Sequence, residues 1–154
     1  MILTAHIITS GTVGELIGNP AGAFVVGIIL HFILDAIPHY DTVDKIPQFS
    51  RRQIAFTTTE IIIGILMLLF VIRLPLNRTI LNSTFAWGAL GGMMPDLLDN
   101  VPFWEKRFQA TKIGSKFHHF HCTIHKKQPS FFVGMTIQII TIVLFLTIHF
   151  AVSK

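Results

Sequence analysis

The chain has 154 residues, of which 51% are hydrophobic and only 13% are charged. A soluble domain usually carries about 25% charged residues, and one this small could not bury so much apolar surface. The composition therefore argues against an ordinary soluble protein and predicts an all-α integral membrane protein, with residues 1–154 forming a single membrane domain. The net charge of +4 comes from basic residues beside the apolar stretches. We therefore interpret these residues as signals that set the membrane topology, in preference to a nucleic-acid-binding surface.

The first predicted helix runs from Ile2 to Ile17. It is shorter than the later apolar stretches, and it contains His6, several hydroxyl side chains and Glu15. We therefore expect it either to be buried among the other helices or to lie at the membrane interface.

Four longer apolar stretches follow, each close to the roughly 20 residues that a membrane-spanning helix needs. The predicted spans are Pro20–Ile37, Gln53–Ile72, Thr79–Asn100 and Pro129–Val152. The predicted architecture is a polytopic membrane helix bundle with four long spans and a shorter N-terminal helix.

Lys and Arg residues are distributed unequally between the two sides of this bundle. Nine lie in the loops after the first and third long spans, Pro38–Arg52 and Val101–Lys127, and three lie on the opposite side. The positive-inside rule then places the basic loops in the cytoplasm. Their positive charge would also attract anionic headgroups, so membrane lipids are the predicted partners.

An internal repeat relates two of the spans. Residues 27–41 read GIILHFILDAIPHYD and residues 91–105 read GGMMPDLLDNVPFWE, and both copies share the order Leu-Asp-x-x-Pro-x-aromatic-acid at an offset of 64 residues. We favour duplication of a helical hairpin, with repeats at 20–72 and 79–152 related by an axis along the membrane normal. Chance similarity of two apolar segments is the alternative.

Histidines and acids gather near the span ends on the basic side. His31 and Asp35 are four residues apart and share a helix face, as do Asp96 and Asp99, three residues apart. Imidazole nitrogens together with carboxylate oxygens suit Zn²⁺ and other first-row divalent ions, and a cation would neutralise acids that are costly to place in lipid. The predicted metal ligands are His6, His31, Asp35, His39, Asp96, Asp99, His118, His121 and His125.

Parts of this cluster also have a purely structural interpretation. Asp35 and Asp99 could end helices and meet water, and the segment His118–His125 could lie at the interface. His149 lies near the opposite face and is not predicted to be a ligand.

Two of these motifs resemble those of the predicted membrane-bound metal-dependent hydrolases. The segment Gly91–Asp99, GGMMPDLLD, is similar to that family's G-x-L-L-P-D-x-D-H segment, and His118–His125, HHFHCTIH, is similar to its later H-R-G-x-T-H segment. The early His6 is similar to the family's histidine close to the N-terminus. The second acid follows Asp96 by three residues instead of two, and Asn100 stands where the family has a histidine. The resemblance implies a metal-activated water that attacks an ester or a phosphoester.

The predicted function is that of a membrane-embedded metal-dependent hydrolase acting on a lipid or a lipid-linked ester or phosphoester at the cytoplasmic interface. Zn²⁺ is the expected metal, with Mn²⁺ or Mg²⁺ as alternatives, and it would lower the pKa of a bound water toward ~7. Asp41 or Glu60 would accept the proton of that water. The alternatives are a divalent-cation carrier or sensor that uses the same ligands, and a membrane scaffold without metal.

Overall fold

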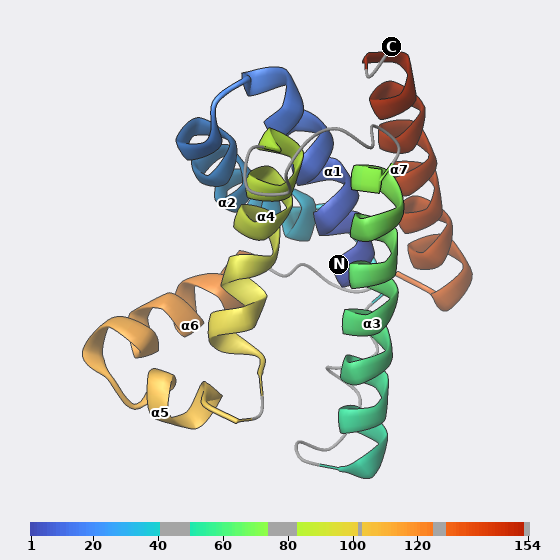
Figure 1. Cartoon of the computed structure of the whole chain (residues 1–154). Coiled ribbons are helices and arrows are strands. Elements are labelled where there is room, and N and C mark those ends of the chain that lie inside the picture. Colours follow the sequence, from blue (N-terminus) through green and yellow to red (C-terminus); the bar gives the residue numbers. More distant parts are fainter. Residues whose placement is uncertain (41–49, 74–82, 102, 125–128, 153–154) are drawn as a thin grey trace.

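The computed structural model describes residues 1–40, 50–73, 83–101, 103–124 and 129–152, and these residues form seven α-helices (Figure 1). The helices are α1 (Leu3–Ile17), α2 (Pro20–Ala36), α3 (Arg51–Arg73), α4 (Thr84–Asp99), α5 (Glu105–Gln109), α6 (Lys112–Ile124) and α7 (Phe131–Val152). The predicted all-α class is confirmed for the described residues. The bounds of α1, α2, α3 and α7 lie within two residues of the predicted ones, while residues 79–82 of the third predicted span lie outside the described residues.

Local sequence signals set the tight turn between α1 and α2. Gly18 ends α1 in the left-handed conformation with φ of 76°, which a residue without Cβ adopts freely. The Asn19 side chain then caps α2 by accepting a hydrogen bond from the Gly22 backbone N–H at 2.7 Å, and Pro20 occupies the first helical position, where its missing N–H costs nothing. The two helices therefore fold back on each other and pack together.

The short first helix is the centre of the molecule. It packs against α2, α3, α4 and α7 (Figure 1). Most of its residues from Leu3 to Gly14 are buried, including its histidine and hydroxyl side chains. Of the two predicted locations for this helix, burial among the others is confirmed. Its apolar core partners are Val71 of α3 and Phe85 and Ala89 of α4.

Small residues allow α1 and α4 to approach closely. Ser10 and Gly14 on α1 face Gly88 and Gly92 on α4, so a methyl group added at Gly88 would overlap the Ser10 carbonyl. Two small-x-x-x-small pairs facing each other are typical of helices that pack backbone against backbone. Because His6 lies one turn before Ser10, this contact places His6 beside the Gly92 end of α4.

Helices α2 and α4 contact each other through residues that correspond in the two copies of the predicted repeat. A Cβ on Gly27 would overlap the Gly88 carbonyl, and a Cβ on Gly91 would overlap the Phe24 carbonyl. Since Phe24 corresponds to Gly88 and Gly27 to Gly91 at an offset of 64 residues, each contact is the counterpart of the other. Such reciprocal contacts are what a twofold axis between α2 and α4 produces, while the duplication of the whole hairpin stays a prediction.

The outer helices expose apolar side chains instead of burying them. Large hydrophobic residues are exposed along α2, α3 and α7, among them Ile29, Leu66, Ile140 and Leu144. Within the described residues, α7 is the one helix that is both long and apolar enough to span a membrane, and α2 is apolar but only 17 residues long. The four-span arrangement therefore stays a prediction, because α2 and α4 form shorter helices than expected and α3 begins and ends with arginine.

A helical hairpin occupies the segment that was predicted as a basic loop. Helices α5 and α6 pack on each other and extend from the end of α4 (Figure 1). The Trp104 indole N–H donates to the Leu97 carbonyl at 2.7 Å, and the Gln109 amide donates to the Asp99 carbonyl at 3.1 Å. These bonds fix the hairpin so that α6 turns back toward the ends of α2 and α4.

Candidate metal centre

Five predicted side chains converge where α1, α2, α4 and α6 meet. Their donor atoms form two overlapping groups, one of His6, His31 and Asp96 and the other of His31, Asp35 and His121. Within each group, all the donor atoms lie within 4.8 Å of one another. The structure thus brings together buried imidazole and carboxylate groups that could bind a metal ion.

His31 is held in one orientation by the backbone of α4. Its Nδ1 lies 2.8 Å from the Gly92 carbonyl oxygen, which can only accept a hydrogen bond, so Nδ1 carries the proton. The lone pair of the neutral ring is then on Nε2, which lies 3.1 Å from Asp35 Oδ2 and 3.2 Å from His121 Nε2. An N–H to a backbone carbonyl is the arrangement that commonly orients a metal-binding histidine.

His121 is oriented in the same way, but by a carboxylate. Its Nδ1 lies 3.0 Å from Asp99 Oδ2 and its Nε2 lies 3.3 Å from Asp35 Oδ2 and 3.9 Å from Asp96 Oδ1. With Nδ1 donating to Asp99, the Nε2 lone pair faces the same small volume as that of His31. Each of the two imidazole Nε2 atoms thus lies within 3.9 Å of both Asp35 Oδ2 and Asp96 Oδ1.

Asp99 acts through other residues in this arrangement. Its buried carboxylate accepts hydrogen bonds from Nδ1 of both His118 and His121 at 3.0 Å and from the Gln109 amide at 3.1 Å. It belongs to neither of the two donor groups. Its contacts orient side chains of α6, and its predicted role as a metal ligand stays a prediction.

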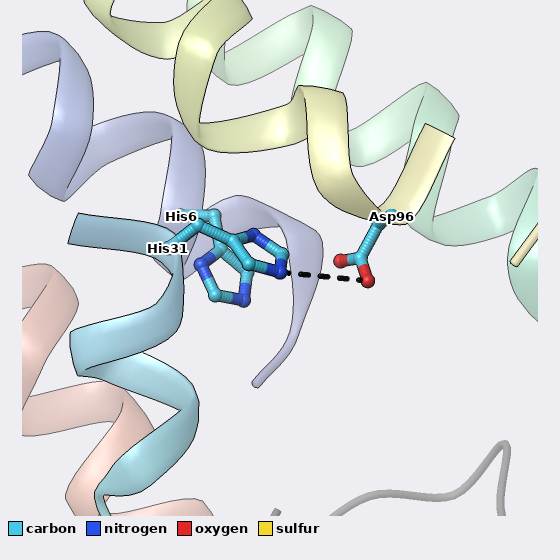
Figure 2. A group of neighbouring side chains, drawn as sticks. All are labelled: His6, His31 and Asp96. Atoms are coloured by element: carbon cyan, nitrogen blue, oxygen red, sulfur yellow. Dashed lines mark ion pairs between the residues drawn. The ribbon is translucent and has the colours of Figure 1, made fainter. Parts of the chain in front are cut away.

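His6 is the least satisfied member of the cluster. It is fully buried and its ring stacks on that of His31, with centroids 4.2 Å apart and an angle of 22° between the planes (Figure 2). Its Nε2 lies 3.2 Å from Asp35 Oδ1, but neither ring nitrogen makes a hydrogen bond of acceptable geometry. Figure 2 shows the Asp96 carboxylate on the side of His31, with His31 Nε2 3.8 Å from Asp96 Oδ1.

The surroundings of His121 favour positive charge. Burial by itself lowers the pKa of its imidazole, but the hydrogen bonds with Asp35 and Asp99 and the charges of Asp96 and Asp35 outweigh burial and raise the pKa above its ordinary value. The amino group of Met1 also lies 2.5 Å from Asp35 Oδ1. The carboxylates thus create a place for a cation.

The remaining predicted site residues lie apart from the two groups. His39 is buried after the end of α2 and donates from Nδ1 to the Ile37 carbonyl at 2.8 Å. Glu60 is half-buried on α3, and His118 contacts Asp99 at the edge of the cluster. Asp41 and His125 lie outside the described residues. None of these residues belongs to either donor group, so their predicted roles as metal ligands or proton acceptors stay predictions.

Two participants were not identified from the sequence. Gln109 joins the hairpin to Asp99, and the Gly92 carbonyl orients His31. A backbone carbonyl leaves no signal in the side-chain pattern. A lone glutamine within a basic segment also resembles ordinary surface polarity, so neither could be singled out.

A second pair, the buried His149 and the partly exposed Glu15, lies at the other end of α1. His149 Nδ1 of α7 is 2.8 Å from Glu15 Oε2, and the His149 ring packs edge-on against Phe85. His149 belongs to neither donor group, in keeping with its predicted exclusion from the ligands.

Comparison with protein families, curated proteins and solved structures finds no match for this chain. The resemblance to the membrane-bound hydrolases therefore stays a prediction based on short motifs, and the chemistry of the site is argued from its own geometry.

Proposed function

We propose that this protein is a membrane-embedded metal-dependent hydrolase acting on a lipid or a lipid-linked phosphoester or ester. The observation that carries the proposal is the convergence of His31 Nε2 and His121 Nε2 with the carboxylates of Asp35 and Asp96. Nitrogen and oxygen donors in this number suit Zn²⁺, with Mn²⁺ as the nearest alternative. An ion held there would lower the pKa of a bound water toward ~7 and supply hydroxide at neutral pH.

Access to the cluster differs among its members. The side chains of His31, Asp35 and His121 are at most 3% exposed, whereas that of Asp96 is 23% exposed. A catalytic metal needs an open coordination position on one side, unlike a structural one, which is enclosed by protein ligands. The Asp96 side is therefore the entry for water and substrate.

His118 is the best-placed proton acceptor among the described residues. Its side chain is 42% exposed, and its Nδ1 lies 3.0 Å from Asp99 Oδ2, so Nε2, which lies 3.6 Å from the Cys122 sulfur, is the nitrogen that would take a proton from water. A carboxylate that orients an imidazole in this way is a frequent arrangement for a general base. We assign His118 this role in place of Asp41 or Glu60.

The α5–α6 hairpin supports a lipid substrate. Phe103, Trp104 and Ile113 are exposed on it, with exposed fractions of 86%, 45% and 79%. Its exposed charged side chains are all basic, namely Lys106, Arg107, Lys112 and Lys116. Burial raises the pKa of Glu105, which weakens the one acidic charge in this hairpin. Aromatic and basic side chains together are typical of a surface at the level of anionic headgroups.

The distribution of polar groups favours a hydrolase over a cation carrier. Between His6 and Glu15, α1 offers only hydroxyl side chains. The Thr12 hydroxyl is bound to the Phe145 carbonyl at 3.3 Å. A carrier would need ligands along the whole path, whereas chemistry needs them at one place.

Metal analysis of the protein purified in detergent is the primary test. We expect bound divalent metal, hydrolysis of bis(4-nitrophenyl) phosphate or 4-nitrophenyl acetate, and loss of activity after chelation that Zn²⁺ or Mn²⁺ restores. His121→Ala should lose both metal and activity, and His119→Ala, an exposed neighbour, should lose neither. A folded wild-type protein that binds no metal after exposure to these ions would contradict the proposal.

The orientation is tested separately. We propose that the basic segments 38–52 and 101–127 face the cytoplasm, because they carry nine of the twelve Lys and Arg residues. Single cysteines placed at Ser115 and at Ser153, in a Cys122→Ser background, should react differently with an impermeant thiol reagent added to intact cells. Labelling at Ser115 without labelling at Ser153 would reverse the orientation.

A further inference from the structure

We infer that the site binds two metal ions bridged by the Asp35 carboxylate, and that its substrate is a phosphoester. This inference rests on the metal site proposed above and specifies its number of ions. The starting point is that the donor atoms form two groups that share His31 instead of one group of five. A distance of 4.8 Å is about twice the longest Zn–ligand bond of roughly 2.3 Å, so donors further apart than this cannot reach one ion.

His31 can serve only one of the two groups. Its Nδ1 proton is committed to the Gly92 carbonyl, which leaves one lone pair, on Nε2. That nitrogen lies 3.1 Å from Asp35 Oδ2 and 3.2 Å from His121 Nε2, but 3.8 Å from Asp96 Oδ1. The first ion is therefore assigned to His31, His121 and Asp35 Oδ2.

His6 is left over by this assignment, and its environment requires a partner. Both of its ring nitrogens are buried without a hydrogen bond of acceptable geometry, which is costly for a polar group removed from water. Stacking on His31 uses the face of the ring and leaves its nitrogens unsatisfied. A second ion between His6 Nε2 and Asp35 Oδ1, which are 3.2 Å apart, would satisfy that nitrogen, and Asp96 lies within reach of the same ion.

The Asp35 carboxylate has the geometry of a bridge. Its Oδ2 faces His31 and His121, and its Oδ1 faces His6 Nε2 at 3.2 Å. The Met1 amino group lies 2.5 Å from Oδ1, so this side of the carboxylate already accommodates a cation. The second metal ion would replace the Met1 amino group as the partner of Oδ1. Two divalent ions that share one hydroxide would also neutralise the three carboxylates of Asp35, Asp96 and Asp99.

A two-ion centre specifies the substrate class. Two metal ions roughly 3.5–4 Å apart stabilise both the attacking and the leaving oxygen of a phosphoryl group during displacement. Hydroxide from water, whose proton passes to His118, forms the new P–O bond. The P–O bond to the alcohol breaks, and the departing alkoxide takes the proton back from His118. The products are a phosphate monoester and an alcohol when the substrate is a diester, and the basic α5–α6 hairpin suits such an anion.

Metal stoichiometry and electron paramagnetic resonance of the Mn²⁺-loaded protein test the number of ions. The full chain should carry its affinity tag at the C-terminus, so that Met1 keeps its position. We expect two ions per chain and the spectrum of an exchange-coupled pair. His6→Asn should retain one ion with the spectrum of an isolated Mn²⁺, while His149→Asn, a buried histidine outside the cluster, should retain two.

The possible outcomes separate this inference from the proposed function. One ion per wild-type chain without exchange coupling would overturn the two-ion centre but leave the single-metal hydrolase standing. No bound metal in the folded chain would overturn both. Two ions retained by His6→Asn would also overturn the assignment of His6.

The substrate class has its own test. We expect the two-ion protein to hydrolyse bis(4-nitrophenyl) phosphate in preference to 4-nitrophenyl acetate, and His6→Asn to lose the phosphodiesterase activity. Preference for the acetate ester, or unchanged phosphodiesterase activity in His6→Asn, would overturn the assignment of a phosphoester to this site. If His6→Asn does not fold, as judged by gel filtration, His6→Gln replaces it.

Discussion

The two ends of α1 bury the same kinds of side chain but differ in how those side chains are satisfied. At one end, Glu15 and His149 form a closed pair at 2.8 Å. At the other end, His6 lacks hydrogen bonds, and carboxylates and imidazoles face one another with spare lone pairs. In an acid–histidine pair each group satisfies the other, whereas a buried cluster with more lone pairs than protons needs a cation to satisfy them.

The comparison shows why residue type alone does not identify a metal site. His149 and His31 are both buried histidines beside an acid on an apolar helix. The Nδ1 proton of His31 is fixed by a backbone carbonyl, and its Nε2 faces a second histidine, whereas His149 pairs with the Glu15 carboxylate and packs edge-on against Phe85. Orientation and the number of converging donors are what distinguish the two ends.

Asp35→Ala should have the largest effect, because this carboxylate touches all three histidines of the cluster. We expect loss of bound metal to below the detection limit of elemental analysis and loss of hydrolysis. Asp35→Asn, which keeps the shape of the side chain, should behave alike. The matched control is Glu15→Gln at the other end of α1, which should retain its metal. Full metal content in folded Asp35→Asn would contradict the conclusion that a metal ion binds at this end of α1 through Asp35.

Asp99→Asn should have the next largest effect. The Asn amide has one acceptor oxygen where the carboxylate has two, so it cannot accept hydrogen bonds from all three of the donors that now bind Asp99. His121 therefore loses its fixed orientation. Loss of such a partner typically weakens metal affinity about 10–100-fold, and we expect a change of that size. Metal competition with a chelator of known affinity would measure it. Complete loss of metal would instead make Asp99 a direct ligand.

Gly88→Ala should disturb the helix crossing that lies between the two ends. The added methyl group would overlap the Ser10 carbonyl and crowd the Gly14 backbone, which cannot move away without separating α1 from α4. We expect a loss of about 1–3 kcal/mol in the free energy of unfolding, as is typical of overpacking. Thermal unfolding in detergent would measure it.

The control for this substitution is Gly64→Ala. Its methyl group would meet only the flexible end of the Ile7 side chain, so a small change is expected. Equal destabilisation by both substitutions would indicate that the α1–α4 backbone contact is not special.

His149→Ala should have the smallest effect. It removes the hydrogen bond with Glu15, whose side chain is 24% exposed and can be hydrated. We expect unchanged metal content and a loss of roughly 1 kcal/mol in stability. Elemental analysis would measure the metal content, and thermal unfolding would measure the stability. A drop in metal content would indicate that the two ends of α1 are coupled.

The sequence by itself determined much of the local structure. Hydrophobic stretches and cap residues such as Gly18, Asn19 and Pro20 defined most helices to within two residues, because helix termini depend on nearby residues. Helical spacing also paired His31 with Asp35 correctly. The predicted loop after Val101 was instead a helical hairpin, because amphipathic helix α6 has neither the length nor the apolar composition of a span.

Only the tertiary structure decided which donors share a site. His6, Asp35 and His121 are far apart in the chain, and the close approach of α1 to α4 at Ser10 and Gly88 and the return of α6 bring them together. The same packing places the Asp99 carboxylate against Nδ1 of both His118 and His121. The physical reason is that coordination depends on where lone pairs point. Their direction is set by hydrogen bonds to groups on other helices, which the order of residues does not encode locally.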